Sequence, residues 1–239
     1  MAEKKYGYSD KILPNQEFFR YLYHDSAPFE LALHGLMSSY ARRFDAAKFD
    51  LVTPKNIDFE EMSTPPGQLA LLATLIRLIG AKTVLEIGSF IGNSAMQFAS
   101  MVGEDGHVTT IELGREFADL ARENFRRNGF ASRVTLLEGS AGDILTRLPP
   151  HSFDLVFIDG SKQDYLDYSL KSEELLSDRG MIVVDDVFFH GDALNAAPST
   201  DKGRGCKTLL DHYRHSESFE SLLLPVFNGI LILYRKRTI

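Results

Sequence analysis

The sequence predicts an α/β protein whose doubly wound, mostly parallel sheet is covered by helices on both faces. From residue 67 onward, apolar runs of strand length alternate with amphipathic segments of helix length. Nearly continuous apolar strands separated by helices of ten or more residues are typical of a parallel sheet that is buried on both sides. The last two apolar runs instead flank Asn228-Gly229, a hairpin turn signal, so we expect the sheet to finish with an antiparallel hairpin.

The first half of this pattern contains three expected strands. The apolar segment LALLATLIRLIG is interrupted by Arg77 and is too short to span a bilayer, so it predicts a core-packed helix over 67–79. The strands KTVLEIG, HVTTIEL and RVTLLEG follow at 82–88, 107–113 and 133–139. Helices are expected at 93–101, at 115–128 with Gly129 ending it, and, as a short helix, near 142–148.

The second half of the pattern continues the alternation of strands and helices and then ends in two successive strands. It comprises the strand FDLVFID at 153–159, a helix at 164–176, a turn SDRG at 177–180 and the strand MIVVDDV at 181–187. The closing strands are expected within SFESLLLPVF and ILILYRKR, at 218–227 and 230–237. Together these elements describe one continuous sheet.

Residues 1–60 have a different composition from the rest of the chain. They mix polar and aromatic residues, with helical spacing at 17–25 and 29–44 and no strong strand signal before Met62. We therefore expect a helical N-terminal extension over 1–60, available for substrate or partner contacts, and a second unit over 61–239. The two are expected to form a single compact domain.

Composition limits the classes of partner. With 239 residues and 44% hydrophobic content, the chain can bury a substantial core. A net charge of -7 disfavours binding to nucleic acid or to an anionic membrane. Cys206 is the single cysteine, which excludes a disulfide framework, and the segment MAEKKYGYSD lacks the apolar core of a signal peptide. We expect a cytoplasmic protein that binds a small neutral or cationic ligand.

A glycine-containing turn after the first strand predicts a nucleoside site. Glu86, Gly88 and Gly92 stand in the order E-x-G-x-x-x-G, and Phe90 occupies the place of the second glycine that admits a pyrophosphate in dinucleotide sites. Glu112 ends the second strand, where an acid accepts hydrogen bonds from ribose hydroxyls. S-adenosylmethionine (SAM) combines a ribose, an ammonium and a sulfonium with no phosphate. A simple tight turn between strand and helix is the alternative.

The loop after the third strand is the expected position of the adenine. In the segment EGSAGD, Ser140 and Ala141 would contact that ring, unless the segment is only a polar loop.

Several segments, taken together and in order, resemble the cation-dependent class I O-methyltransferases typified by the caffeoyl-CoA and catechol enzymes and their bacterial relatives. The resemblance covers about residues 60–235, through MSTPPGQ, VLEIGSFIGNSA, TTIEL, FDLVFIDGSKQDYLDY, GMIVVDDV and LLLPVFNGILI. It implies a Rossmann-like sheet of seven strands, methyltransferase activity of the unit 61–239, and a homodimer. It also implies a set of site residues, which comprises cofactor contacts at Ser63, Glu86, Gly88, Ser94, Glu112, Ala141 and Asp159, and a metal at Asp159, Asp185 and Asp186.

Three departures from the family pattern affect the expected site. Relatives usually have Asn where this chain has Asp186, which adds a negative charge. The usual Asn-x-x-x-Trp-x-Gly segment after the fifth strand is replaced by DDVFFHGDALN, which changes the expected substrate wall. Pro65 and Pro66 stand beside Ser63, where relatives often have acids.

Acidic residues follow two strands that are expected to be neighbours. Because the carboxyl ends of parallel strands meet at one edge, Asp159 and the pair Asp185-Asp186 should lie side by side. Three carboxylates repel one another unless a cation or protons compensate, and oxygen-only ligands suit magnesium, manganese or calcium. An isolated Asp pair also occurs as a helix cap or loop turn, and that alternative remains open without the resemblance.

The mechanism that follows from these residues is metal-assisted methyl transfer. A divalent ion would chelate two adjacent oxygens of a catechol-like acceptor, and Lys162 would act as general base, its amine brought towards working pH by the dication. A solvated lysine at a helix start is the alternative role of Lys162. The competing functions are a nicotinamide-dependent oxidoreductase on a similar sheet and a non-catalytic protein that keeps the cofactor pocket.

Overall fold

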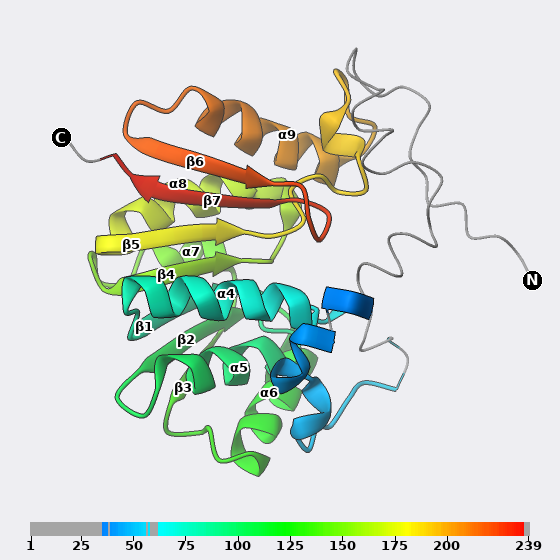
Figure 1. Cartoon of the computed structure of the whole chain (residues 1–239), viewed down its shortest axis with the longest axis vertical. Coiled ribbons are helices and arrows are strands. Elements are labelled where there is room, and N and C mark those ends of the chain that lie inside the picture. The colour runs from blue at the N-terminus through cyan, green and yellow to red at the C-terminus, as the bar shows by residue number, and fades with distance from the viewer. Residues whose placement is uncertain (1–34, 38, 56, 58–61, 237–239) are drawn as a thin grey trace, which may run out of the picture.

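The computed structural model describes residues 35–37, 39–55, 57 and 62–236, and its centre is one seven-stranded sheet (Figure 1). The strand order is β3-β2-β1-β4-β5-β7-β6. The strands are β1 (Thr83–Ile87), β2 (His107–Glu112), β3 (Val134–Glu138), β4 (Phe153–Ile158), β5 (Leu176–Val184), β6 (Phe219–Leu224) and β7 (Ile230–Arg235). β1 to β5 pair in parallel, whereas β7 is antiparallel to both β5 and β6. The predicted fold class is confirmed.

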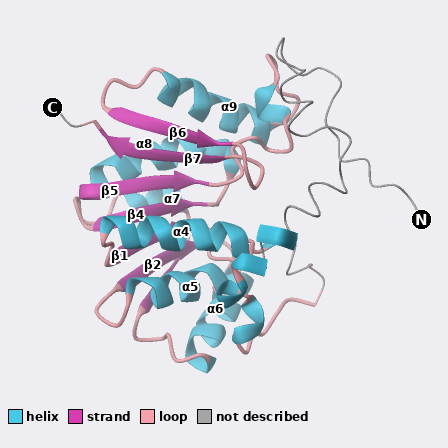
Figure 2. Cartoon of the chain, viewed as in Figure 1, coloured by secondary structure: helices cyan, strands magenta, loops and turns pink. Residues whose placement is uncertain are grey.

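The helices cover both faces of this sheet, as Figure 2 shows. They are α4 (Pro66–Ile79), α5 (Asn93–Val102), α6 (Arg115–Arg127), α7 (Ala141–Leu145), α8 (Tyr165–Leu175) and α9 (Asp201–Arg214), with short 3-10 helices η1 (Arg42–Phe44), η2 (Ala46–Lys48), η3 (Lys162–Asp164) and η4 (Asp192–Leu194). Successive strand residues point to opposite faces. Val84 therefore packs in the core beneath α4, α5 and α6, and Leu85 in the core beneath α7, α8 and α9.

The carboxyl-terminal hairpin forms where the sequence predicts it, with shorter strands. β6 ends at Leu224, before Pro225, because proline cannot donate a hydrogen bond to a neighbouring strand. The loop 225–229 then returns the chain through Asn228 and Gly229, both at positive φ. β7 lies between β5 and β6, so the hairpin extends the parallel sheet by two antiparallel strands.

One local prediction is wrong, and one predicted helix is shorter than expected. The segment SDRG at 177–180 is part of β5, which begins at Leu176, and not a turn. The Ser177 hydroxyl of this segment donates to Asp154 Oδ1 at 2.8 Å. Asp154 belongs to the neighbouring strand β4, whereas a turn would pair the serine hydroxyl within its own segment. The helix expected near 142–148 is α7, which begins one residue earlier and ends at Leu145. Pro149 and Pro150 follow it closely and cannot extend a helix.

Part of the N-terminal region packs against α4, α5 and α6. Residues 17–25 lie outside the described residues, and 35–37 and 39–40 are helical, as expected for 29–44. Phe44 is buried in the core beneath α4 and α5, and the buried amide of Gln97 donates to the Phe44 carbonyl at 2.8 Å. The described residues before Met62 contain no strand. The division into units 1–60 and 61–239 stays a prediction.

Asn124 of α6 joins this N-terminal segment to the turn after β1. Its Oδ1 accepts from Val52 N at 2.7 Å, and its Nδ2 donates to the carbonyls of Val52 and Ile91 at 3.1 and 3.0 Å. Because the side chain is fully buried, Asn124→Ala is expected to lower the free energy of unfolding by about 2–3 kcal/mol in urea denaturation. Asn128→Ala removes similar bonds to Asp50 at a half-buried position and should cost less than half as much. Equal losses would contradict the account.

No helix among the described residues is both long and apolar enough to cross a membrane.

Candidate active site

Three of the predicted site positions lie next to one another at the carboxyl edge of the sheet. Ile87, Ile158 and Val184 are paired across β1, β4 and β5, and the chain continues from them into Gly88, Asp159 and Asp185. Asp159 N donates to the Ile87 carbonyl and Asp185 N to the Ile158 carbonyl, each at 2.9 Å. The expectation that the acids after the fourth and fifth strands end side by side is confirmed.

The turn from β1 into α5 brings backbone close to this edge. Gly88 has φ of +101°, and a Cβ there would lie 2.2 Å from the Asp159 carbonyl oxygen. Gly92, at φ of +84°, caps α5, and a Cβ there would lie 2.3 Å from the Phe125 ring. Both glycines are therefore needed for the turn itself. The turn and a ligand site are compatible, so contact of Gly88 with a cofactor stays a prediction.

Glu86 is a buried carboxyl with one unused acceptor. Its Oε2 accepts from the Thr110 hydroxyl at 2.5 Å, while Oε1 has no hydrogen-bond partner among the described residues. Burial raises the pKa of Glu86 to about 7, and the Thr110 and Ser94 hydroxyls oppose this rise, although the Ser94 hydroxyl makes no hydrogen bond to Oε1. A buried polar atom without a partner is costly. This arrangement suits a ligand that brings a positively charged donor.

Further unpartnered polar atoms belong to segments that flank this turn. They are Ser63 Oγ before α4, Ser89 Oγ in the turn and Asn93 Oδ1 at the start of α5, all buried and without partners in the described part of the chain. Ser89 and Asn93 did not emerge as site residues from the sequence, although both lie within the quoted segment VLEIGSFIGNSA. Serine and asparagine are ordinary at a turn and a helix start, so their residue types gave no signal.

Glu112 ends β2, as predicted, but both of its oxygens already have backbone partners. Oε2 accepts from Phe90 N and Oε1 from Gly114 N, each at 2.8 Å. A carboxylate oxygen can accept more than one hydrogen bond, so the predicted ribose contact remains available. The Glu112 carbonyl also accepts from Gly139 N at 2.9 Å, which fixes the loop that carries Ser140 and Ala141 beside it.

The acids after β4 and β5 surround the ammonium of Lys162. Lys162 Nζ lies 2.9 Å from Asp186 Oδ2 and 3.7 Å from Asp159 Oδ1, and it donates to the Tyr165 hydroxyl at 3.3 Å. Burial alone would lower the pKa of Lys162, but the carboxylates of Asp159 and Asp186 outweigh it and raise that pKa. In this arrangement Lys162 is held as a cation. It is mostly buried, so the alternative of a solvated lysine is not supported.

This acid–lysine cluster, formed by Asp159, Lys162, Asp185 and Asp186, carries more carboxyl groups than one ammonium neutralises. Burial raises the pKa of Asp159 to about 6, opposed by Lys162 and reinforced by Asp186. Burial and the nearby Asp159 raise the pKa of Asp185 well above its ordinary value. The cluster therefore takes up protons in place of a second positive charge.

The donor chemistry of this cluster fits a hard divalent ion, since it offers only oxygen ligands with uncompensated negative charge. However, no group of three or more His, Cys, Asp or Glu side chains in the described part of the chain is placed to hold one metal ion. Two of the carboxylates are instead directed at Lys162. Metal binding at Asp159, Asp185 and Asp186 therefore stays a prediction.

Two residues beside the cluster were missed by the sequence analysis. Gln68 of α4 is almost completely buried and opposes the rise in the pKa of Asp185, although its Nε2 has no hydrogen-bond partner among the described residues. Asn228, interpreted from the sequence only as a turn residue, donates from Nδ2 to Asp186 Oδ1. An amide that serves a distant carboxylate carries no local sequence signal.

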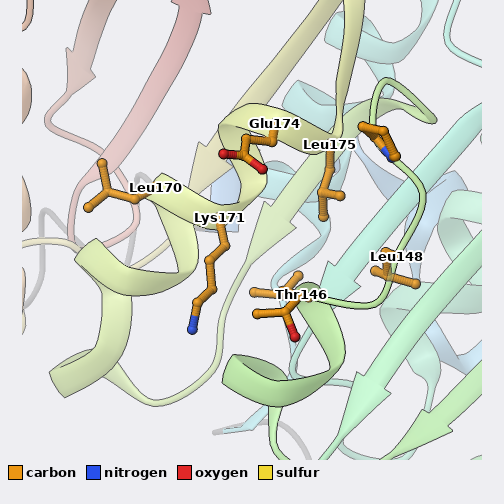
Figure 3. Close-up of a pocket in the computed structure, with 8 residues that line it drawn as sticks. Thr146, Leu148, Leu170, Lys171, Glu174 and Leu175 are labelled. Atoms are coloured by element: carbon orange, nitrogen blue, oxygen red, sulfur yellow. The ribbon is translucent and has the colours of Figure 1, made fainter.

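A separate groove of about 470 Å³ lies between α7 and α8 (Figure 3). It is lined by Leu145, Thr146, Leu148, Pro150, Leu170, Lys171, Glu174 and Leu175. Leu148 and Pro150 precede β4, and Leu175 precedes β5, so the groove is near the amino ends of these strands. It contains none of the predicted site residues.

Comparison with known proteins decides the family. The sequence profile of the O-methyltransferase family matches residues 37–237, which is most of the chain. The chain belongs to the O-methyltransferase family. A protein of Mycobacterium sp. (strain JLS) assigned as an O-methyltransferase is 33% identical to it over 180 residues, covering 75% of this chain and 82% of that protein. The family resemblance and the enzyme class predicted from the sequence are confirmed, and a nicotinamide-dependent oxidoreductase is excluded.

Solved structures resemble this O-methyltransferase over almost its whole length. The O-methyltransferase TomG from Streptomyces achromogenes, solved in complex with SAM, has a TM-score of 0.70 at 25% identity and covers 92% of this chain and 95% of its own. The methyltransferase PaMTH1 of Podospora anserina, solved with S-adenosylhomocysteine (SAH) bound, has a TM-score of 0.69 at 26% identity. The match covers 96% of this chain and 100% of PaMTH1. The seven-stranded sheet is thus shared with proteins that carry such cofactors.

Proposed function

We propose that this O-methyltransferase moves a methyl group from SAM to a hydroxyl of a small catechol-like acceptor, assisted by a divalent cation. The observation that carries the proposal is the placement of two features at one sheet edge. Glu86 offers an unpartnered buried acceptor at the end of β1, and the acid–lysine cluster lies after β4 and β5. One feature suits a cationic nucleoside and the other suits the activation of a hydroxyl.

The cofactor would lie along the carboxyl ends of β1, β2 and β3. Glu86 Oε1 is available to accept a hydrogen bond from an ammonium group, and Glu112 keeps acceptor capacity for ribose hydroxyls. Ser140 and Ala141, fixed beside Glu112 by the bond from Gly139 N, would border the adenine. Ser94 of α5 lies beside Glu86, Ser63 precedes α4, and SAM bound here would present its sulfonium methyl group for transfer.

Lys162 is the proposed general base for the acceptor hydroxyl. A base must have a free lone pair, yet Asp159 and Asp186 raise the pKa of Lys162 and favour its protonated form. Lys162 can therefore take a proton only when the charge of these carboxylates is compensated. The resulting phenolate would attack the methyl carbon in line while the bond from that carbon to sulfur breaks and S-adenosylhomocysteine leaves, and the rigid strand ends would hold the reactants close.

Asp159, Asp185 and Asp186 are the residues that would hold a divalent ion. Such an ion would compensate their charge and acidify a phenol bound to it. The raised pKa values of Asp159 and Asp185 support this assignment, because both groups lack a sufficient positive partner. Magnesium, manganese and calcium all accept such oxygen ligands.

The partners follow from composition and family. We propose a small hydroxylated acceptor, and the net charge of -7 disfavours nucleic acid and anionic membranes. A homodimer and a cytoplasmic location remain proposals that rest on the family resemblance and on the sequence.

Methyl transfer can be measured directly with SAM labelled in its methyl group. We expect labelled product from catechols in the presence of magnesium, and little from matched monohydroxy phenols, which cannot chelate. A chelator should lower the rate at least about tenfold, and excess magnesium should restore it. No transfer to any catechol would contradict the acceptor class, and a rate insensitive to chelator would contradict the cation. Thermal stabilisation by SAM without any transfer would favour a non-catalytic cofactor-binding protein.

A further inference from the structure

Backbone in an unfavourable conformation is concentrated in two adjacent loops beside the acid–lysine cluster. Asp186, Phe189 and His190 in the loop after β5, and Phe227 and Asn228 in the loop between β6 and β7, all have φ between +43° and +63°. They are five of the seven non-glycine residues with positive φ in the described part of the chain. Such conformations persist where surrounding contacts fix them, and they gather at functional sites.

Asn228 makes three of the hydrogen bonds that join these two loops, beside the bond from Val187 N to the Gly229 carbonyl at 3.0 Å. Its side-chain Oδ1 accepts from His190 N at 2.9 Å, and its backbone carbonyl accepts from Phe188 N at 2.9 Å. Its Nδ2 donates to Asp186 Oδ1. One side chain therefore holds both the backbone of the loop after β5 and the carboxylate at its start.

The Asp186 carboxylate is held from two sides as a result. Oδ1 accepts from Asn228, and Oδ2 lies 2.9 Å from Lys162 Nζ. Rotation of this carboxylate would separate Oδ2 from the lysine. Asn228 and Lys162 together set the direction of the Asp186 side chain, while Asp159 and the Tyr165 hydroxyl also contact the Lys162 ammonium.

We propose that Asn228 is a positioning residue that sets Asp186 and the loop 186–191 for the transfer reaction, a claim that rests on the proposed function of this cluster. The side chains at positions 186 and 228 must together supply one hydrogen-bond donor and one acceptor. An aspartate at 228 would face a carboxylate with a carboxylate, since an ionised Asp only accepts. The reverse arrangement, with the amide at 186 and the carboxylate at 228, keeps the donor, the acceptor and the total charge. It also leaves an amide oxygen at 186 for Lys162.

Reciprocal exchange of the two side chains tests this proposal. We expect Asn228→Asp to lower kcat about tenfold to a hundredfold, with the affinity for SAM unchanged within about twofold. The double variant Asp186→Asn, Asn228→Asp should recover at least half of the loss on a logarithmic scale. Asn228→Ala, which adds no charge, is measured beside them in case Asn228→Asp does not fold. Wild-type kcat in Asn228→Asp, or no recovery in the double variant, would overturn the proposal.

Amide hydrogen exchange separates a failure of this inference from a failure of the proposed function. Peptides covering 186–191 should exchange faster in Asn228→Asp and Asn228→Ala, and at nearly the wild-type rate in the double variant, whether or not an acceptor is known. Asn128→Asp is the matched control, because Asn128 also joins two segments through its amide but lies far from the cluster in the contact with Asp50. It should change neither kcat nor exchange over 186–191. Unchanged exchange in both Asn228 variants would contradict the positioning role.

Discussion

Glu86→Gln is expected to weaken SAM binding about tenfold to a hundredfold and, without cofactor, to make the protein more stable above pH 7. The carboxylate would be replaced by a neutral amide of nearly the same shape, so the charge-assisted bond to an ammonium is lost. The fully buried Glu86 has a pKa raised from 4.5 to about 7, mainly by burial. The folded protein therefore keeps a proton there that the unfolded chain has already released.

The sign of the pH effect follows from this difference in protonation. The stability contributed by protonated Glu86 is complete below pH 4.5 and is lost as pH rises through about 7. The loss amounts to about 3 kcal/mol for a shift of this size. Glu86→Gln should lose less stability than the wild type between pH 5 and pH 8, measured by urea denaturation without SAM. The exposed control Glu104→Gln should leave both the pH profile and SAM affinity unchanged. Parallel pH profiles for wild type and Glu86→Gln would refute the assignment.

Lys162→Met is expected to reduce the rate of methyl transfer about a hundredfold to ten-thousandfold, because both the proposed base and the counter-charge of Asp159 and Asp186 are removed. The affinity for SAM should change by no more than a few-fold, since Lys162 belongs to the acceptor side of the site. The measurement is kcat at saturating SAM and acceptor, together with SAM affinity by calorimetry.

A lysine elsewhere provides the control for this substitution. Lys207→Met on α9 removes a half-buried lysine whose ammonium pairs with Asp211 and not with the acids of the cluster. It should retain wild-type kcat. Wild-type kcat across pH in Lys162→Met would contradict both the role of Lys162 as a base and the importance of its ammonium in the cluster.

The positions of the strands along the chain could be predicted from the sequence, because the hydrophobic pattern of a strand lies within its own segment. β1, β4 and the end of β5 are nearly continuous apolar runs, and such runs have few alternatives once helices separate them. The prediction of a turn at SDRG was wrong because this segment pairs with the neighbouring strand, where Asp154 accepts a hydrogen bond from the Ser177 hydroxyl. That contact depends on the tertiary structure.

The candidate site likewise contains residues that could be predicted from the sequence and residues that could not. Asp159 and Asp185 were predictable neighbours, since each directly follows the end of a parallel strand. Gln68 and Asn228 were not, because each acts on a carboxylate from a segment distant in sequence. The lowered pKa predicted for Lys162 concerns a site that holds a divalent ion, and it stays a prediction. Without such an ion, the folded chain places two carboxylates against the amine, and these raise the pKa of Lys162.

A crystal structure with S-adenosylhomocysteine is the most direct test of the central claim that the carboxyl edge of β1, β2 and β3 is the cofactor site beside the acid–lysine cluster. The account predicts that the amino group of the ligand contacts Glu86 Oε1, that the ribose hydroxyls contact Glu112, and that the sulfur faces Asp159 and Lys162. A ligand in the groove between α7 and α8, or one that leaves Glu86 Oε1 without a partner, would contradict it.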